Sequence, residues 1–309
     1  MTTTQSPSTS SAAADFGIGG TVETYQWDWE GCQLSVVYET LGQGSPVLLL
    51  PAFSTVSTRA EMRGLAELLA AKFQVVAVDW PGFGQSSRPP LDYRPALYHQ
   101  FLQDFTKTVF NTSAAVVAAG HAAGYVMRLA QQQPSIWSRV VLVAPTWRGP
   151  LRAMGVNQQI GGTVRQMVRS PIFGQALYKL NTTPSFLSFM YRSHVYSDAA
   201  KVTPEFVATR WRSTQQPGAR FAPAAFVTGT LDPVTNRADF LTWFQSLSLP
   251  LMVVIGEQTP PKSRAEMEAL ASLPGVQTRI LPGSLGLHEE YAAELAEVVL
   301  PFLESDDGQ

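Results

Sequence analysis

The sequence predicts an α/β protein, in which a mostly parallel sheet is covered by helices on both faces and interrupted by a helical cap insertion. Short runs of residues that are apolar throughout alternate with segments whose apolar residues recur at helical spacing. Strands that are buried on both faces by helices have this composition. The alternation stops after Ala144 and resumes near Leu249, and 309 residues suffice for one large core with such an insertion.

The first half of the chain begins with two strand-like segments, 25–29 and 33–39, which a turn at Glu30-Gly31 would join as an antiparallel pair. After them, continuous apolar runs predict buried strands, and the longer segments between them have helical periodicity. In chain order we expect a strand at 47–50, a helix at 59–72, a strand at 73–78, a helix at 98–110, a strand at 114–118 and a strand at 140–144.

The second half begins with residues that are mostly helical in spacing and rich in aromatic side chains, and only a short run near Phe226 resembles a strand. The alternation then returns with a strand at 249–255, a helix at 263–273, a strand at 277–281 and a helix at 289–303. The first residues, rich in Ser, Thr, Ala and Gly, are typical of a disordered tail. The chain is therefore expected to divide into a disordered tail at 1–20, a first core part at 21–146, a helical cap at 147–221 and a second core part at 222–309.

Composition excludes several classes of protein. A net charge of −2 gives no reason to expect a nucleic-acid partner, and a single cysteine, Cys32, excludes an intramolecular disulfide. The four histidines are scattered without metal-ligand spacing, so we expect no metal and no cofactor. No apolar run approaches the roughly 18–20 residues of a membrane-spanning helix. We expect a soluble, cytoplasmic protein, with peripheral membrane association as a further option.

The most informative segment is 119–124, which reads Ala-Gly-His-Ala-Ala-Gly and joins an apolar run to a helical segment. Small residues between a strand and a helix are typical of a nucleophile elbow, a tight turn that presents one side chain to a pocket. The middle position of this turn is Ala122, which has no hydroxyl, thiol or carboxylate. The segment therefore predicts the turn without its usual chemistry.

Four features in this order resemble the α/β-hydrolase superfamily. They are the loop Asp79-x-Pro81-Gly82-x-Gly84-x-Ser86, the turn Gly120-His121-x-x-Gly124, the position of the cap, and Pro282-Gly283 followed by His288-Glu289-Glu290. The resemblance covers nearly everything after the tail and implies the α/β-hydrolase fold. Segments 144–150 and 282–291 also resemble a branch of plastid and cyanobacterial α/β-hydrolase-like proteins.

Active members of that superfamily carry a nucleophile at the elbow, an acid after a late strand and a histidine before the last helix. Carried over by motif, these three positions fall on Ala122, Thr259 and Leu285. The resemblance thus implies a triad lost at all three positions, which one engineered substitution at Ala122 would not produce. The loop that helps to bind the oxyanion in active members also differs from the family pattern. Here it reads Pro51-Ala52-Phe53, whereas His-Gly followed by an apolar residue is usual.

Other polar residues near these motifs could have either a structural role or an acid–base role. His121 and Asp79 are expected to be structural, and His288 becomes a base only if the final loop shifts in register; Asp232 is expected to cap the next helix. All three of His121, His288 and Asp79 stay open as alternative acid–base groups. The residues expected to line a ligand pocket are Phe53, Ser54, His121, Ala122, Ala123 and Trp147.

The cap carries an excess of positive charge. Its only acidic residues are Asp198 and Glu205, so ten basic residues less two acidic ones leave about +8. Such a segment suits an anionic membrane surface or an acidic protein, although a solvated basic face needs no partner. The basic residues are Arg148, Arg152, Arg165, Arg169, Lys179, Arg192, Lys201, Arg210, Arg212 and Arg220.

Two functional hypotheses follow. The preferred one is a non-hydrolytic pseudoenzyme that lacks the Ser-His-Asp triad and binds a small hydrophobic or acidic ligand or docks a partner. The alternative is an enzyme of the α/β-hydrolase superfamily, either an esterase-like hydrolase or a non-covalent acid–base catalyst that uses His288, His121 or Asp79.

Overall fold

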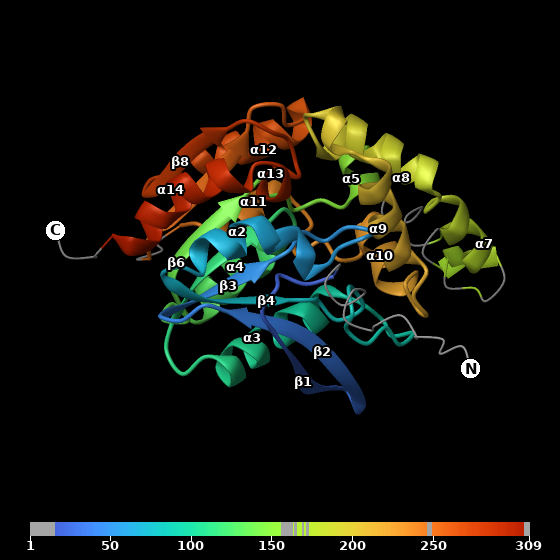
Figure 1. Ribbon diagram of the computed structural model, residues 1–309, viewed down its shortest axis with the longest axis horizontal. Helices are drawn as coiled ribbons and strands as arrows, with labels where there is room; N and C mark the ends of the chain where they lie inside the picture. The colour runs from blue at the N-terminus through green and yellow to red at the C-terminus, as the bar shows by residue number, and fades with distance from the viewer. Residues whose placement is uncertain are drawn as a thin grey trace, which may run out of the picture.

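The computed structural model confirms the predicted fold class and describes residues 16–155, 163, 166–168, 170, 173–245 and 249–305. Eight strands form one sheet in the order β1-β2-β4-β3-β5-β6-β7-β8 (Figure 1). The strands are β1 (Thr21–Trp29), β2 (Cys32–Leu41), β3 (Ser45–Leu50), β4 (Phe73–Val78), β5 (Ala114–Ala119), β6 (Trp137–Val143), β7 (Leu251–Gly256) and β8 (Val276–Leu281).

The sheet is antiparallel at its N-terminal edge and parallel elsewhere. β1 and β2 form the expected hairpin, and the left-handed backbone of Glu30 and Gly31, with φ of 51° and 81°, makes the tight turn between them. β2 also pairs antiparallel with β4, whereas β3 to β8 run parallel, with Leu49 opposite both Ala77 and Val117. The carboxyl ends of β3, β5, β6 and β7 therefore meet at one edge, where ligands bind in open α/β sheets.

Helices cover both faces of the sheet because the chain reverses direction across it. The connection from β3 to β4 runs one way and those from β4 to β5 and β5 to β6 run the other, and right-handed crossovers then place their helices on opposite faces. Accordingly α2 packs against α14, and α3 packs against α4. The core helices are η1 (Arg59–Met62), α2 (Arg63–Leu69), α3 (Pro95–Val109), α4 (Ala122–Gln132), α12 (Pro261–Ala271), α13 (Leu287–Glu290) and α14 (Ala292–Glu304).

The segment between β6 and β7 is helical, and most of it gathers at the right of Figure 1, while its last helix (Arg237–Thr242) lies near the centre. Residues 147–221 of this segment are called the cap below. The expected strand near Phe226 was wrong: this residue lies in a helix, in a run whose alanines favour helical backbone. The described helices of this segment are α5 (Pro150–Ala153), α7 (Phe173–Leu180), α8 (Pro184–Met190), η2 (Tyr191–Val195), η3 (Ala199–Lys201), α9 (Pro204–Thr214), α10 (Phe221–Val227) and α11 (Arg237–Thr242). Within the described part of the chain, no helix combines the length and the hydropathy needed to span a bilayer.

A fully buried arginine ties the N-terminal hairpin to the core. Arg59, at the start of η1, contacts Glu39 of β2 at 2.8 Å and Asp79 after β4 at 2.5 Å. Its remaining terminal nitrogen donates to Gln85 at 2.8 Å, and the Glu39 carboxylate also accepts from the amide of Ile18. Burial raises the pKa of Asp79, while Arg59 acts in the opposite direction. Asp79 is thus a structural group that fixes the loop after β4, as expected.

Replacing Arg59 by methionine should destabilise the fold by about 3–5 kcal/mol, because two carboxylates would stay buried without their cation. Urea denaturation measures this change. The matched control is Arg264→Met, which removes an exposed pair with Glu268 on α12 and should change stability by less than about 1 kcal/mol. Equal losses in the two variants would contradict the role given to Arg59.

Candidate functional site

The turn between β5 and α4 has its strained residue at Gly120. Gly120 has a left-handed backbone with φ of 53°, and its amide donates to Val143 at 2.9 Å. Its carbonyl oxygen accepts from the amides of Ala123 and Thr146, which fixes the turn against the end of β6. Next to it, Ala144 is also left-handed, with φ of 45°, a conformation that costs an alanine free energy and is often found at functional sites.

This geometry corrects the position assigned to the elbow residue. The motif places it at Ala122, but Ala122 begins helix α4 and is fully buried. Glycine has no Cβ, so it adopts the left-handed backbone at the least cost, and the turn forms at Gly120 instead. In an elbow the strained residue carries the nucleophile. Neither Gly120 nor Ala122 has a side chain that could serve as one.

The loop that follows β3 lies directly against this elbow. A Cβ built on Gly120 would stand 3.1 Å from the Cβ of Ala52, and the Trp80 indole nitrogen holds the loop by donating to the carbonyl of Pro51 at 3.0 Å. Phe53 and His121 are both buried, and the described residues supply no hydrogen-bond acceptor to the backbone amide of either. Buried amides ordinarily have a partner, and amides beside an elbow are groups that can donate to an oxygen atom of a ligand.

The side chain of Phe53 belongs to an aromatic cluster in the core. Its ring lies 4.8 Å from that of Trp80, 5.0 Å from that of Tyr98 and 6.0 Å from that of His121. The structure thus brings two predicted pocket residues, Phe53 and His121, together at the elbow. Phe53 contributes its backbone to the candidate site, while its ring fixes the position of that backbone.

His121 is held by the loop that precedes α11. Its Nε2 lies 3.0 Å from the carbonyl oxygen of Leu231 and 3.6 Å from the carboxylate of Asp232, while Nδ1 has no partner among the described residues. Burial lowers the pKa of His121 to about 4 and raises that of Asp232 to about 7. Asp232 accepts from the amide of Gly149 at 2.6 Å. The expectation that Asp232 caps the next helix was wrong, because Asn236 caps α11.

The other two triad positions lie in loops that touch each other. The amide of Gln258 donates to Gly283 at 2.9 Å, and the Gln258 side chain accepts from the Gly283 amide at 2.6 Å. Thr259, at the acid position, is buried, and its hydroxyl has no partner in the described part of the structure. Leu285, at the histidine position, is half-buried and packs against the core.

His288 belongs to a separate buried cluster. Its Nε2 lies 3.4 Å from the Glu61 carboxylate, and its Nδ1 has no partner among the described residues. Next to this pair, Arg210 of the cap forms an ion pair with Glu289. Burial raises the pKa of Glu289 and Arg210 opposes that shift. Sequence reasoning missed Glu61, although Thr58-x-x-Glu61 has the spacing of a capping box at a helix start.

The cap is bonded to the final loop of the core. The Ser284 hydroxyl donates to His194 at 3.2 Å, and the Gly286 amide donates to Val195 at 2.9 Å. The Glu290 carboxylate accepts from the amides of Ser197 and Asp198. The loop that contains the predicted histidine position, Leu285, therefore binds the cap to the core.

The remaining predicted residues have local roles. The Ser54 hydroxyl accepts from the Val56 amide at 3.2 Å, and Ala123 is buried in α4. The Trp147 indole donates to Glu266 of α12 at 3.1 Å, and its ring packs on that of Phe240. Among the described residues, no group of three or more His, Cys, Asp or Glu side chains could hold a metal ion.

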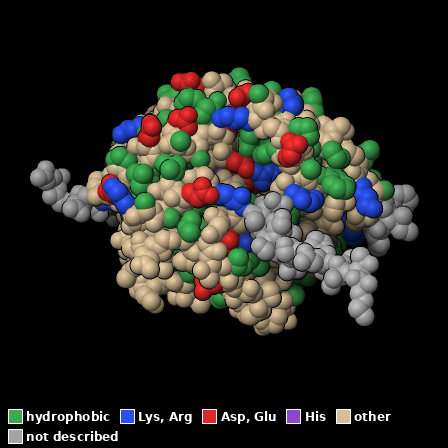
Figure 2. Space-filling view, viewed as in Figure 1, with side chains coloured by type: hydrophobic (Ala, Val, Ile, Leu, Met, Phe, Trp, Pro, Cys, Tyr) green, Lys and Arg blue, Asp and Glu red, His purple; other side chains and the backbone are tan. Residues whose placement is uncertain are grey.

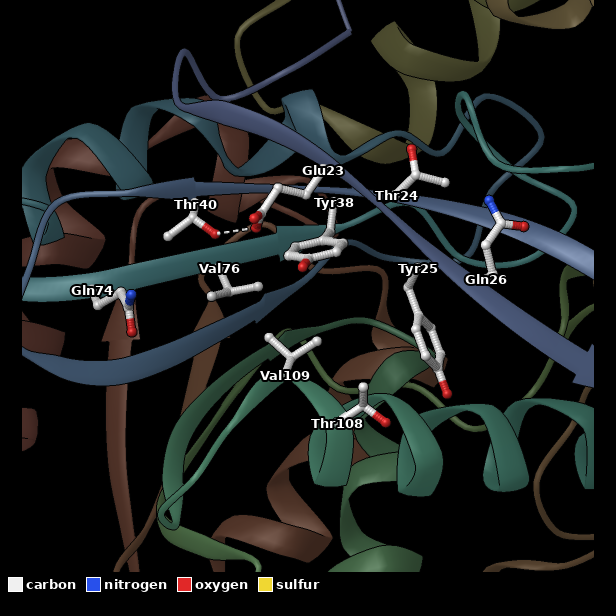
Figure 3. Close-up of a pocket in the computed structure, with 10 residues that line it drawn as sticks. All are labelled: Glu23, Thr24, Tyr25, Gln26, Tyr38, Thr40, Gln74, Val76, Thr108 and Val109. Atoms are coloured by element: carbon white, nitrogen blue, oxygen red, sulfur yellow. Dashed lines mark hydrogen bonds between the residues drawn. The ribbon is translucent and has the colours of Figure 1, made fainter.

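A pocket of about 390 Å³ lies away from these residues, against the N-terminal hairpin (Figure 3). It is lined by residues of β1, β2, β4 and α3, among them Glu23, which accepts from the Thr40 hydroxyl at 3.2 Å. Burial and the neighbouring Glu23 raise the pKa of Tyr38 to about 12. This pocket contains none of the predicted site residues.

Comparison with solved structures agrees with this architecture. A bromoperoxidase from Bacillus anthracis has a TM-score of 0.68 at 17% identity, over 92% of this chain and 100% of its own. A thermophilic esterase from Thermogutta terrifontis has a TM-score of 0.71 at 17% identity, over 92% of this chain and 98% of its own. Similarity at this level shows the fold alone.

Comparison with protein sequences extends the likeness along the chain. An uncharacterized protein of Mycobacterium tuberculosis is 24% identical over 280 residues, or 87% of this chain and 78% of that protein. A Synechocystis protein provisionally named a non-heme chloroperoxidase is 22% identical over 283 residues, or 88% of this chain and 95% of that protein. The sequence model of the alpha/beta hydrolase family matches residues 47–298, and the chain belongs to that family.

Proposed function

We propose that this protein is a non-hydrolytic member of the family that binds a small ligand through a carbonyl or carboxylate oxygen at the elbow. The observation that carries the proposal is Gly120. The residue with the left-handed backbone has no side chain, and the amides of its neighbour His121 and of Phe53, in the loop that contacts it, have no acceptor among the described residues. Amides placed in this way bind an oxygen atom with partial or full negative charge.

The chemistry of the surrounding positions supports binding without hydrolysis. A covalent acyl intermediate needs a nucleophile activated by an adjacent base. Thr259 has a neutral hydroxyl and Leu285 cannot accept a proton, so neither supplies the acid or the base. The Ser54 hydroxyl is already engaged within its own turn.

The alternative is non-covalent acid–base catalysis, and one observation favours it at His288. Its 3.4 Å approach to Glu61 resembles the pairing that orients a general base, and its Nδ1 is unpartnered among the described residues. His121 is a poorer candidate because its lowered pKa weakens it as a base. Asp79 is poorer still, because it is bound by Arg59.

The first test uses methyl hexanoate as a small ester. Added to isotopically labelled protein, it should shift the amide resonances of Phe53 and His121 while no hexanoate is released. The amide of Gly31, in the distant hairpin turn, is the internal control. A fluorophosphonate probe, which reacts with activated serines, should leave the protein unlabelled. Release of hexanoate or stoichiometric labelling would refute a non-hydrolytic function.

A nucleophile added to the elbow should not restore hydrolysis. Gly120→Ser and Ala122→Ser place a hydroxyl at the two candidate positions, but a serine without an adjacent base is a weak nucleophile at neutral pH. Both variants should therefore hydrolyse the ester no faster than the unmodified protein. Saturable turnover by either one would reveal a base within reach and would favour the alternative centred on His288.

The lowered pKa of His121 predicts a loss of stability in acid. In the unfolded chain His121 binds a proton below its ordinary pKa of about 6.5. In the folded protein it stays neutral until the pH approaches 4. Stability is thus fully present above that ordinary value and declines between it and about 4.

For His121, a pKa of about 4 contributes a loss of about 2 kcal/mol between about pH 7 and pH 5. The raised pKa of Asp232 acts in the opposite direction, because the folded protein then binds a proton that the unfolded chain does not. The loss due to His121 is therefore measured by urea denaturation as the difference between the unmodified protein and His121→Gln, which keeps a donor for Leu231 and should be less sensitive to acid. The exposed residue His194 provides the matched control, His194→Gln, which should leave the decline unchanged. An unaltered slope in His121→Gln would show that this histidine does not cause it.

A further inference from the structure

Large apolar side chains are exposed mainly on the cap. Val22, Leu68 and Ile280 are isolated examples on the core. The exposed residues of the cap are Met154, Met167, Leu180, Phe186, Phe189 and Trp211. Isolated apolar side chains on a surface need no explanation, but a gathering of large ones marks an interaction site. We propose that this outer face of the cap docks onto an anionic membrane surface.

The clearest part of this face is the corner between α7 and α8. Leu180, the last residue of α7, is 70% exposed. On α8, Phe186 and Phe189 are 38% and 58% exposed, and a spacing of three residues places them on the same side of the helix. Leu187 of the same helix is buried instead, so α8 anchors one side in the cap and presents two aromatic rings outward.

Cationic side chains stand beside these apolar ones. Lys179 precedes Leu180 and is exposed, and the exposed Arg192 donates to the hydroxyl of Ser188, which lies between the two phenylalanines of α8. Arg192 also donates to the carbonyl of Val202, and both acceptors are neutral oxygens that leave the positive charge uncompensated. Arg212 is exposed on α9, which packs against α8. Figure 2 shows hydrophobic and basic side chains next to one another over these helices.

Only part of the basic excess of the cap belongs to this face. Arg210 and Arg152 form ion pairs with Glu289 and Asp232, and Lys201 donates to the carbonyl of Glu290. Those three cations hold the cap together and to the core. Arg165 and Arg169 lie outside the described residues. Arg148 and Arg220 lie over the rings of Trp147 and Phe221. The cations used below are Lys179, Arg192 and Arg212, which are exposed on or beside the helices that carry the apolar side chains.

The combination of groups favours a lipid surface over an acidic protein. Phenylalanine, leucine and methionine side chains enter the boundary between headgroups and acyl chains, while lysine and arginine attract anionic lipids. An acidic protein partner accounts for the cations, whereas an anionic lipid surface accounts for the cations and the exposed apolar side chains together. This inference does not depend on the proposed ligand site, because none of its residues lies at the elbow.

Co-sedimentation of the full chain with vesicles tests the proposal. Vesicles of phosphatidylcholine mixed with phosphatidylglycerol should bind the protein several-fold more than phosphatidylcholine alone. That preference should weaken as salt rises to physiological strength, since exposed charges are screened beyond about 8–10 Å. The double variant Phe186→Ser/Phe189→Ser should lose most of the binding, and Lys179→Gln/Arg192→Gln/Arg212→Gln should lose only the preference for anionic lipid.

The matched control replaces exposed apolar residues of the core, Val22→Ser/Ile280→Ser, and should bind as the unmodified protein does. Circular dichroism and thermal melting verify that each variant is folded. Binding that ignores lipid charge, salt and both cap variants overturns the proposal, as does an equal loss in the control. Binding to polyglutamate without binding to vesicles would also overturn it and would identify an acidic protein as the partner.

Discussion

The packing of the N-terminal hairpin against the core depends on the buried ion pairs of Arg59. This residue begins the helix that follows the loop at 51–54, and its guanidinium joins Glu39 of β2 to Asp79 after β4. One cation thereby joins three segments, since Glu39 and Asp79 each lie 20 residues from Arg59 in the sequence. A buried cation between two carboxylates holds its place strictly, because any displacement leaves a charge without a partner in a medium of low polarity.

The elbow is a tight strand-to-helix turn in which neither Gly120 nor Ala122 carries a nucleophilic side chain. Gly120 and Ala144 are both left-handed at the ends of adjacent strands, and the amides beside the elbow stay buried without acceptors. The left-handed backbone of Ala144 and the amides without acceptors cost free energy in folding, whereas glycine adopts this backbone readily. Under the proposed function, a bound oxygen atom would supply an acceptor at this turn.

The sequence predicted most of the core because its signals are local. A continuous apolar run such as 47–50 predicts a strand buried on both faces, and Glu30-Gly31 predicts a tight turn. The motif assigned the elbow position to Ala122 from sequence spacing alone. The left-handed backbone forms at Gly120 instead, because a residue without a Cβ adopts it at the least cost. The cluster of Glu61, Arg210 and Glu289 could not be predicted, because no local pattern links residues so far apart in the chain.

The bonding of the cap to the final loop has a consequence for how this part of the molecule unfolds locally. The amides of Gly286, Ser197 and Asp198 are donors in bonds that cross from one part to the other, and the Arg210–Glu289 pair crosses at the same place. Because these contacts lie within a few residues of one another on each side, we expect the cap and the last loop to unfold locally as one cooperative unit.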